Sequence, residues 1–194
     1  MSLQDQQKHV LRNKTRTLLE KLSVEETQES SLKICKHVAK LCHEWQTAEI
    51  IAVFAAHNNE PDLSSLHQLL PGKKLYYPRC LPDRGLAFHQ VTTPTAMTPG
   101  TWGIAEPDPD SHPLIEIKTI DLFLCPGLAF GRDGSRLGHG AGYYDRALSN
   151  KSPSAQVWGV GFDIQLFDSV PNDPHDQPLD GIITESGITH AKQG

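Results

Sequence analysis

An excess of basic charge is missing from the sequence. The chain has 18 lysines and arginines against 23 acidic residues, and its formal net charge is −5. Proteins that bind nucleic-acid backbones gather basic residues on one face, whereas the lysines and arginines here are scattered along the chain. We therefore expect no nucleic-acid partner.

Cysteine and histidine occur without a known metal-binding pattern. The four cysteines include no CxxC pair, and the ten histidines include no HExxH cluster. Structural zinc sites use such spacings, so we expect no structural transition-metal site. Cys35 and Cys42 share one face of a predicted helix. We interpret the cysteines as buried, reduced thiols: Cys35, Cys42, Cys80 and Cys125.

Long apolar runs are also missing. The longest runs, such as IIAVFAA at 50–56, fall well short of the roughly 20 residues that span a bilayer as a helix. The first residues, MSLQDQQKHVLRNK, are polar and charged where a secretory signal is apolar. We expect a cytoplasmic protein with no membrane partner.

The rest of the composition is that of an ordinary globular domain. A chain of 194 residues with 38% hydrophobic residues can bury a substantial core. No repeat, low-complexity tract or linker interrupts it. We predict one domain covering residues 1–194, and we expect a monomer.

Two helices are predicted in the N-terminal part of the chain. Apolar residues recur at helical spacing over 4–22. Ser23 and Glu26 then form a capping box, which predicts a second helix ending near Glu44. The residues that this second helix is predicted to bury are Leu32, Cys35, Val38, Ala39 and Cys42.

Strand-like and helix-like segments alternate after these helices. The run 49–56 is typical of a buried parallel strand, a helix is predicted from Pro61 to Pro71, and a strand follows at 73–78. Further strands are predicted at 86–91 as a candidate edge strand, and at 119–130, 155–162 and 180–185. The segment 92–113 carries five prolines and is predicted to be a loop. The pattern predicts a single-domain α/β fold, with a mostly parallel central sheet flanked by helices on both faces.

A glycine-rich segment, RLGHGAGYYDR at 136–146, follows a predicted strand and opens a helix predicted to run to about Ser149. Its spaced glycines would let backbone N–H groups approach a phosphate, its arginines offer planar donors, and Asp145 could ligate Mg²⁺. It lacks the GK[ST] ending of the Walker A loop, and its third glycine falls one place early for GxGxxG. On these residues alone, a phosphate-binding loop and a plain glycine turn are about equally supported.

The surrounding string carries a more specific signal. CPGLAFGRDGSRLGHGAGYYDRAL at 125–148 resembles the signature of the 5-formyltetrahydrofolate cyclo-ligase (methenyltetrahydrofolate synthetase) family, which runs P-x-x-x-F, G-x-R-L-G and G-x-G-[YF]-Y-D. Every defining position is filled. The resemblance extends over nearly the whole chain through four further elements: KHVLR at 8–12, VFAAHNNEPD at 53–62, TWGIAEP at 101–107 and VPNDPHDQPLDGIITE at 170–185.

The resemblance implies a set of site residues. Those for ATP are Lys8, Arg12, Arg136, Leu137, Gly138, His139, Gly140, Ala141, Gly142, Tyr143 and Tyr144. Those for the folate are Phe54, Glu60, Trp102 and Tyr143, and those for Mg²⁺ are Asp145 and Asp176. Lys8 and Arg136 are the implied catalytic cations, which neutralise charge during phosphoryl transfer. Some members carry a basic residue where this chain has Ala141, so His139 receives only a supporting role.

The resemblance also implies the reaction. ATP drives the cyclisation of 5-formyltetrahydrofolate to 5,10-methenyltetrahydrofolate, with release of ADP and phosphate, through a phosphorylated formyl (iminium phosphate) intermediate. No side-chain nucleophile is required. Two other classes stay open: a non-catalytic folate- or nucleotide-binding module, and an isomerase or acyl transferase that acts without ATP on a related α/β scaffold.

Taken singly, several of these residues have simpler interpretations. Lys8 and Arg12, four positions apart, could form a solvated charged helix face. Glu60 could cap a helix, and Asp145 could complement a helix start. Asp176 could be a turn former and Trp102 a loop plug.

Overall fold

An eight-stranded sheet forms the centre of the protein, whose computed structural model describes residues 3–45, 48–173 and 175–192. The strand order is β13-β12-β10-β7-β1-β2-β3-β6. Five neighbouring strands, from β12 to β2, run parallel, while β13, β3 and β6 pair antiparallel. The strand bounds are β1 Ile50–Ala52, β2 Lys74–Cys80, β3 Leu86–Gln90, β6 Leu114–Ile115, β7 Leu122–Cys125, β10 Gln156–Val160, β12 Gly181–Thr184 and β13 Gly187–His190.

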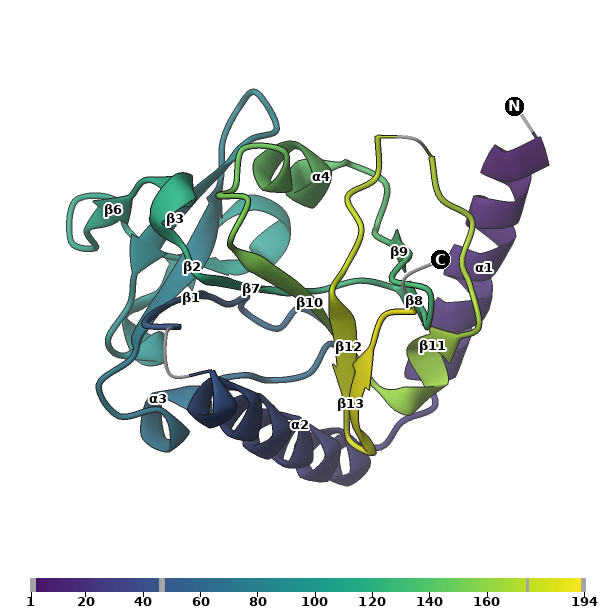
Figure 1. Ribbon diagram of the computed structural model, residues 1–194, viewed down its shortest axis with the longest axis horizontal. Coiled ribbons are helices and arrows are strands. Elements are labelled where there is room, and N and C mark those ends of the chain that lie inside the picture. The colour runs from purple at the N-terminus through teal and green to yellow at the C-terminus, as the bar shows by residue number, and fades with distance from the viewer. Residues whose placement is uncertain (1–2, 46–47, 174, 193–194) are drawn as a thin grey trace.

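Helices cover both faces of this sheet (Figure 1). α2 (Val24–Glu44) and α3 (Leu66–Leu69) lie on one face, and α4 (Tyr143–Leu148) lies on the other. Successive strand residues point to opposite faces, so Ile51 belongs to the core cluster that contains residues of α2, whereas Ala52 belongs to the cluster that contains residues of α4. The predicted α/β fold, with its mostly parallel sheet between helices, is confirmed.

α2 begins at the predicted capping box. The Ser23 side chain accepts the Glu26 N–H, and the Glu26 carboxylate accepts the Ser23 N–H. Four of the five predicted core residues of α2 are buried, but Leu32 is 43% exposed, so that prediction is wrong. Ser31 is buried instead, because its hydroxyl donates to Thr27 O and accepts the Asp62 N–H.

The first helix, α1 (Leu3–Leu19), packs against a second, three-stranded sheet. This sheet has the order β11-β8-β9, with bounds β11 Leu166–Phe167, β8 Ala129–Gly131 and β9 Arg136–Leu137. Leu11 of α1 packs against buried Ala129, Leu137 and Val170. The contact places α1 beside the start of the glycine-rich segment. No helix in the described residues has the length and apolar character to cross a membrane.

Three predicted segments differ from the structure. The helix predicted from Pro61 exists only as α3, because the Asp62 carboxylate accepts the Ser64 N–H and hydroxyl and forms a local turn. The strand predicted over 119–130 divides into β7 and β8, because Pro126 has no N–H for a ladder. The candidate edge strand β3 is paired on both sides, and β6 lies at the edge.

The proline-rich segment 92–113 is more ordered than predicted. It contains the short helical turns η1 (Pro94–Ala96) and η2 (Thr101–Gly103) and a small hairpin of β4 (Thr98–Pro99) and β5 (Ala105–Glu106). Two further turns, η3 (Ile117–Thr119) and η4 (Asp163–Gln165), lie elsewhere. The four cysteines are free thiols; three are buried as predicted, and Cys80 is half-buried.

Candidate active site

The candidate site lies at the carboxyl ends of the parallel strands, where the strand order reverses. From β1 the chain continues to β2 on one side, and from β7 it continues to β10 on the other. Ligands of open α/β sheets bind at such a point. Here the loop after β1 meets the glycine-rich segment, since His139 Nε2 lies 3.3 Å from Glu60 Oε1.

The glycine-rich segment begins with β9 and turns sharply before it enters α4. Gly140 (φ 111°) and Gly142 (φ 71°) adopt left-handed backbone conformations that residues with a Cβ rarely adopt. Arg146 fixes the turn by donating from Nη2 to Ala141 O at 2.6 Å. α4 has only six residues. Any phosphate contact here therefore depends on the amides of the turn more than on a helix dipole.

Arg136 is held inside this site by several partners. It is 7% exposed, its Nη2 donates to Asp145 Oδ1 at 2.7 Å, and its Nη1 donates to Pro126 O at 3.3 Å. Its guanidinium lies 5.5 Å from the centre of the Tyr144 ring. Arg136 Nε is buried and has no hydrogen-bond partner within the described part of the chain, so one donor remains for a ligand oxygen.

Lys8 is the second buried cation of the site. It is 7% exposed, and its Nζ lies 2.7 Å from Asp173 Oδ2 and 2.9 Å from Asp176 Oδ2. Burial alone lowers the Lys8 pKa, but the hydrogen bonds and charges of the two aspartates outweigh it and raise the pKa above its ordinary value. The interpretation of Lys8 as part of a solvated helix face is therefore wrong.

Arg12 lies one helical turn from Lys8 and contacts the glycine-rich segment directly. Its Nε donates to Gly138 O at 2.9 Å. Burial, and then the neighbouring charge of Arg16, lower the Arg12 pKa, but arginine retains its charge at physiological pH. Two basic residues of α1 thus face the site.

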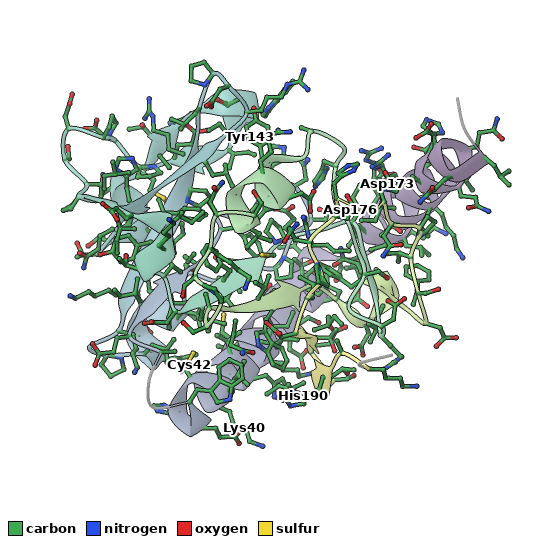
Figure 2. All side chains as sticks on the ribbon, turned by 45° about the horizontal axis from the view of Figure 1, so that its top comes forward. Lys40, Cys42, Tyr143, Asp173, Asp176 and His190 are labelled. Carbon is green, nitrogen blue, oxygen red and sulfur yellow. The ribbon has the colours of Figure 1, made fainter. Side chains whose placement is uncertain are left out.

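The acidic residues of the site come from two segments. Asp173 and Asp176 precede β12 and lie near each other (Figure 2). Asp173 donates its N–H to Asp176 Oδ2 at 2.7 Å. Burial raises the Asp176 pKa, but this hydrogen bond and Lys8 together lower it. Gln177 N lies 3.4 Å from Asp145 Oδ1, so the segment of Asp176 meets the helix of Asp145.

A possible cation site was missed in the sequence. Ligand atoms of Asp173, His175 and Asp176 all lie within 4.8 Å of one another. Asp145 is not part of this group. The run Asp-Pro-His-Asp at 173–176 is the signal that could have identified Asp173 and His175. A cavity of about 70 Å³ connects this segment with the glycine-rich one, and both Arg136 and Asp176 line it.

The predicted folate residues lie in different surroundings. Glu60 Oε2 accepts the His57 N–H at 3.0 Å, and Phe54 is only 3% exposed in the main core cluster. Trp102 is 74% exposed on the hairpin turn η2. The structure therefore brings Glu60 to the glycine-rich segment, leaves Trp102 on an open surface and keeps Phe54 within the core.

The two tyrosines of the segment have different environments. The centre of the Tyr143 ring lies 5.8 Å from the Arg146 guanidinium, and the Tyr143 side chain is close enough to the Cys80 thiol to lower its pKa. Burial raises the Tyr144 pKa well above its ordinary value, and the Tyr144 hydroxyl has no partner among the described residues. Leu137 is 1% exposed, so only its backbone is available to a ligand.

A larger hollow, of about 500 Å³, lies away from all these residues. It is a shallow groove between α2 and α3, lined by Lys36, Ala39, Lys40, His43, Glu44 and Leu69. It contains none of the predicted site residues. We therefore place the candidate site by the convergence of charged side chains at the strand ends and not by the size of this groove.

Comparisons with known proteins identify the family to which the sequence is similar. The sequence model of the 5-formyltetrahydrofolate cyclo-ligase family matches residues 4–185. A Schizosaccharomyces pombe protein named probable 5-formyltetrahydrofolate cyclo-ligase is 31% identical over 207 residues, covering 97% of this chain and 98% of its own. The Escherichia coli K12 5-formyltetrahydrofolate cyclo-ligase is 31% identical over 146 residues, which cover 73% of this chain and 80% of that protein.

Solved structures extend the similarity to the fold. The NMR structure of Aquifex aeolicus 5,10-methenyltetrahydrofolate synthetase superimposes with a TM-score of 0.82 at 30% identity, covering 96% of this chain and 94% of that one. The structure of the Mycoplasma pneumoniae 5,10-methenyltetrahydrofolate synthetase superimposes with a TM-score of 0.75 at 25% identity. The match covers 92% of this chain and 98% of that one. The matched segment contains every predicted site residue. The chain belongs to the 5-formyltetrahydrofolate cyclo-ligase family.

Proposed function

We propose that the protein catalyses the ATP-dependent cyclisation of 5-formyltetrahydrofolate to 5,10-methenyltetrahydrofolate, with release of ADP and phosphate. The observation that carries this proposal is the pairing of two buried cations with carboxylates beside the glycine-rich segment. Lys8 is paired with Asp176, and Arg136 is paired with Asp145. Phosphoryl transfer needs such cations close to the phosphates and such oxygens close to a metal ion.

The residues fit a nucleotide phosphate chain. Arg136 Nε is a buried donor without a partner in the described residues, and a phosphate oxygen would satisfy it. The left-handed glycines turn the backbone between Arg136 and α4 tightly enough for amides to face a ligand. We assign Lys8, Arg12, Arg136 and the backbone of 137–142 to ATP, together with Tyr143 and Tyr144.

The residues also fit a magnesium ion. Asp145 and Asp176 supply the carboxylate oxygens that Mg²⁺ prefers, and the contact between Gln177 N and Asp145 brings their segments together. When bound, Mg²⁺ would neutralise phosphate charge and orient the phosphates for transfer. Asp173 and His175 lie beside Asp176 and could orient it or share the ion.

The folate would lie on the side of Glu60. We assign Glu60 to a polar group of the pterin, and Phe54, Trp102 and Tyr143 to the apolar walls. His139 has a supporting role, because its contact with Glu60 Oε1 connects the folate side with the ATP side. A cleft with aromatic walls and a few polar groups is typical of such ligands.

The proposed chemistry begins by activating the formyl group. Its oxygen attacks the γ-phosphorus of ATP, the bond to the bridging oxygen breaks, and ADP leaves, which gives an N5-iminium phosphate. N10 then adds to the activated carbon and loses its proton, and the carbon–oxygen bond breaks to release phosphate. Lys8 and Arg136 stabilise charge on the transferring group, and the chain holds the two substrates in line. No side-chain nucleophile is needed.

The test is a direct assay of the reaction. Purified protein is mixed with 5-formyltetrahydrofolate and MgATP, and the methenyl chromophore is followed, with a parallel sample that lacks ATP. The proposal expects product only with ATP and one ADP per methenyl group formed. Folded protein that yields no product contradicts it, and product without ATP points to the alternative of an isomerase or transferase.

A further inference from the structure

Trp102 has an unusual backbone conformation for a large residue. Its φ is 62° and its ψ is 15°, in the left-handed region, and its side chain is 74% exposed. L residues disfavour this region, and such conformations persist only when neighbouring groups hold them. An exposed indole in a disfavoured backbone therefore needs a specific support.

Glu106 supplies that support. It is 4% exposed, and its Oε1 accepts the N–H of Thr101 at 3.2 Å and the N–H of Cys80 at 3.4 Å. A Cβ at Gly100 would overlap the Glu106 carboxyl group. The Glu106 carboxylate thus fills the space under the turn. It attaches Thr101, the first residue of the turn, to Cys80, the last residue of β2.

This attachment also reaches the glycine-rich segment. The N–H of Cys80 contacts Glu106, and the Tyr143 side chain lies close enough to the Cys80 thiol to lower its pKa. Tyr143 is the first residue of α4. Glu106 therefore fixes the Trp102 turn to the end of β2, at the place where Tyr143 approaches Cys80.

The contacts of Glu106 are those of a hydrogen-bond acceptor rather than of an ion-pair partner. Two bonds come from backbone N–H groups, and the Cys80 thiol also interacts with the carboxylate. Among the described residues Glu106 forms no ion pair. A glutamine Oε1 at the same position can accept the same two bonds. The conservative variant Glu106→Gln can therefore separate the positioning role from any role of the negative charge.

We propose that Glu106 is a positioning residue, which holds the turn Thr101–Gly103 so that the Trp102 indole is presented to the folate. The inference that Trp102 is presented to the folate rests on the proposed function. The inference that Glu106 supports the turn does not depend on it. Glu106 acts through Trp102. Its removal should therefore weaken folate binding without affecting ATP binding.

The experiment compares five variants: Glu106→Ala, Glu106→Gln, Trp102→Ala, the double variant Glu106→Ala/Trp102→Ala, and Asp121→Ala. Asp121 is the matched control, because its Oδ2 also accepts two backbone N–H groups, those of Glu49 and Ile50 at 2.9 Å each, but at the amino ends of the strands. KM and kcat are measured for both substrates. Amide hydrogen exchange of residues 97–106 is measured by mass spectrometry on each intact protein.

Glu106→Ala is expected to raise the KM for 5-formyltetrahydrofolate about five- to tenfold, the effect of losing one or two hydrogen bonds that order a binding turn, with the KM for ATP unchanged. Glu106→Gln should restore the wild-type KM. The double variant should be no worse than Trp102→Ala, because one residue acts through the other. Hydrogen exchange of the turn should become faster in the two variants that contain Glu106→Ala and should be unchanged in Glu106→Gln and Asp121→Ala.

The inference is overturned if Glu106→Gln behaves like Glu106→Ala, if the two single effects are additive, or if Asp121→Ala shifts the folate KM equally. A wild-type protein that makes no methenyl product overturns the proposed function instead. In that case the hydrogen-exchange comparison alone decides whether Glu106 holds the turn. Unchanged exchange in Glu106→Ala contradicts the inference, whatever the activity.

Discussion

Arg136 and Asp145 form an ion pair of 2.7 Å between Nη2 and Oδ1, although the glycine turn lies between them in the sequence. One partner is the proposed phosphate ligand, and the other is a proposed metal ligand. Lys8 and Asp176 repeat the arrangement at 2.9 Å. Under the proposed function, binding of MgATP exchanges these partners: each cation passes to a phosphate, and each carboxylate passes to the metal. The following predictions depend on this relationship.

Arg136→Ala should impair the use of ATP far more than the binding of folate. The variant removes the buried donors and leaves Asp145 without its partner, so kcat/KM for MgATP should fall about 10²- to 10³-fold. The dissociation constant for 5-formyltetrahydrofolate, measured by calorimetry, should change less than about threefold. Arg132→Ala, at an exposed arginine in the preceding turn, is the control and should change neither. Equal losses for both substrates would refute the assigned role.

Asp145→Asn should raise the Mg²⁺ concentration required for half-maximal activity. The amide keeps the shape of the side chain but is a poorer ligand for a hard cation. Activity is titrated with Mg²⁺ at fixed ATP for wild type and variant. If the requirement does not change, Asp145 serves only to pair with Arg136 and to start α4.

The ion pair of Lys8 predicts a pH window for its contribution to stability. The folded-state pKa of Lys8 is raised above 10.5, so its contribution is fully present below pH 10.5 and is lost as the pH rises through the folded value. The pKa of Asp176 is lowered below 3.8, so its contribution is present above pH 3.8 and is lost as the pH falls through the folded value.

The measurement is urea unfolding of wild type and Lys8→Met across pH. The difference in their free energies of unfolding should be constant between these limits and should shrink outside both. Lys14→Met, at an exposed position of the same helix, serves as the control. If the difference in free energy of unfolding between wild type and Lys8→Met changes steadily between pH 5 and pH 9, another titrating group governs the contribution of Lys8 to stability.

Cys80 should be slow to alkylate near neutral pH. Burial, and then the charge of Glu106, raise the pKa of its thiol from 9.0 to about 11, and only the thiolate is the nucleophile. Its reaction with iodoacetamide, followed by mass spectrometry, should accelerate about tenfold for each pH unit from 7 to 10. Because the thiol contacts Tyr143, 5-formyltetrahydrofolate should protect it. Fast labelling of Cys80 at pH 7 would contradict the raised pKa of its thiol. Labelling that 5-formyltetrahydrofolate does not slow would contradict the expected protection.

The elements of the fold follow patterns that are local in sequence. The capping box at Ser23 and the apolar runs of β1 and β7 specify helix and strand through neighbouring residues. The helix start is confirmed, and both strands are present but shorter than the predicted 49–56 and 119–130. Leu32 is exposed because a buried serine hydroxyl bonds to two backbone groups in its place. Helical spacing cannot predict that Ser31 is buried in place of Leu32, because one partner of the Ser31 hydroxyl, Asp62, lies 31 positions further along the chain.

The chemistry of the site depends on contacts that are distant in sequence. Lys8 and Asp173 are 165 positions apart, and Asp173 gave no signal beyond the short run of residues around it. Glu106 lies within the TWGIAEP motif, but only the fold brings its carboxylate to the N–H groups of Thr101 and Cys80. The family resemblance predicts which residues contact ligands, whereas the residues that hold them in place are identified by the packing.

The most direct test of the account follows the fate of the formyl oxygen. 5-Formyltetrahydrofolate labelled with a heavy oxygen isotope in the formyl group is converted with unlabelled MgATP, and the phosphate released is analysed by mass spectrometry. The account predicts one labelled oxygen in the inorganic phosphate for each methenyl group formed, because that oxygen attacks the γ-phosphorus. Label recovered in water, with unlabelled phosphate, would contradict it.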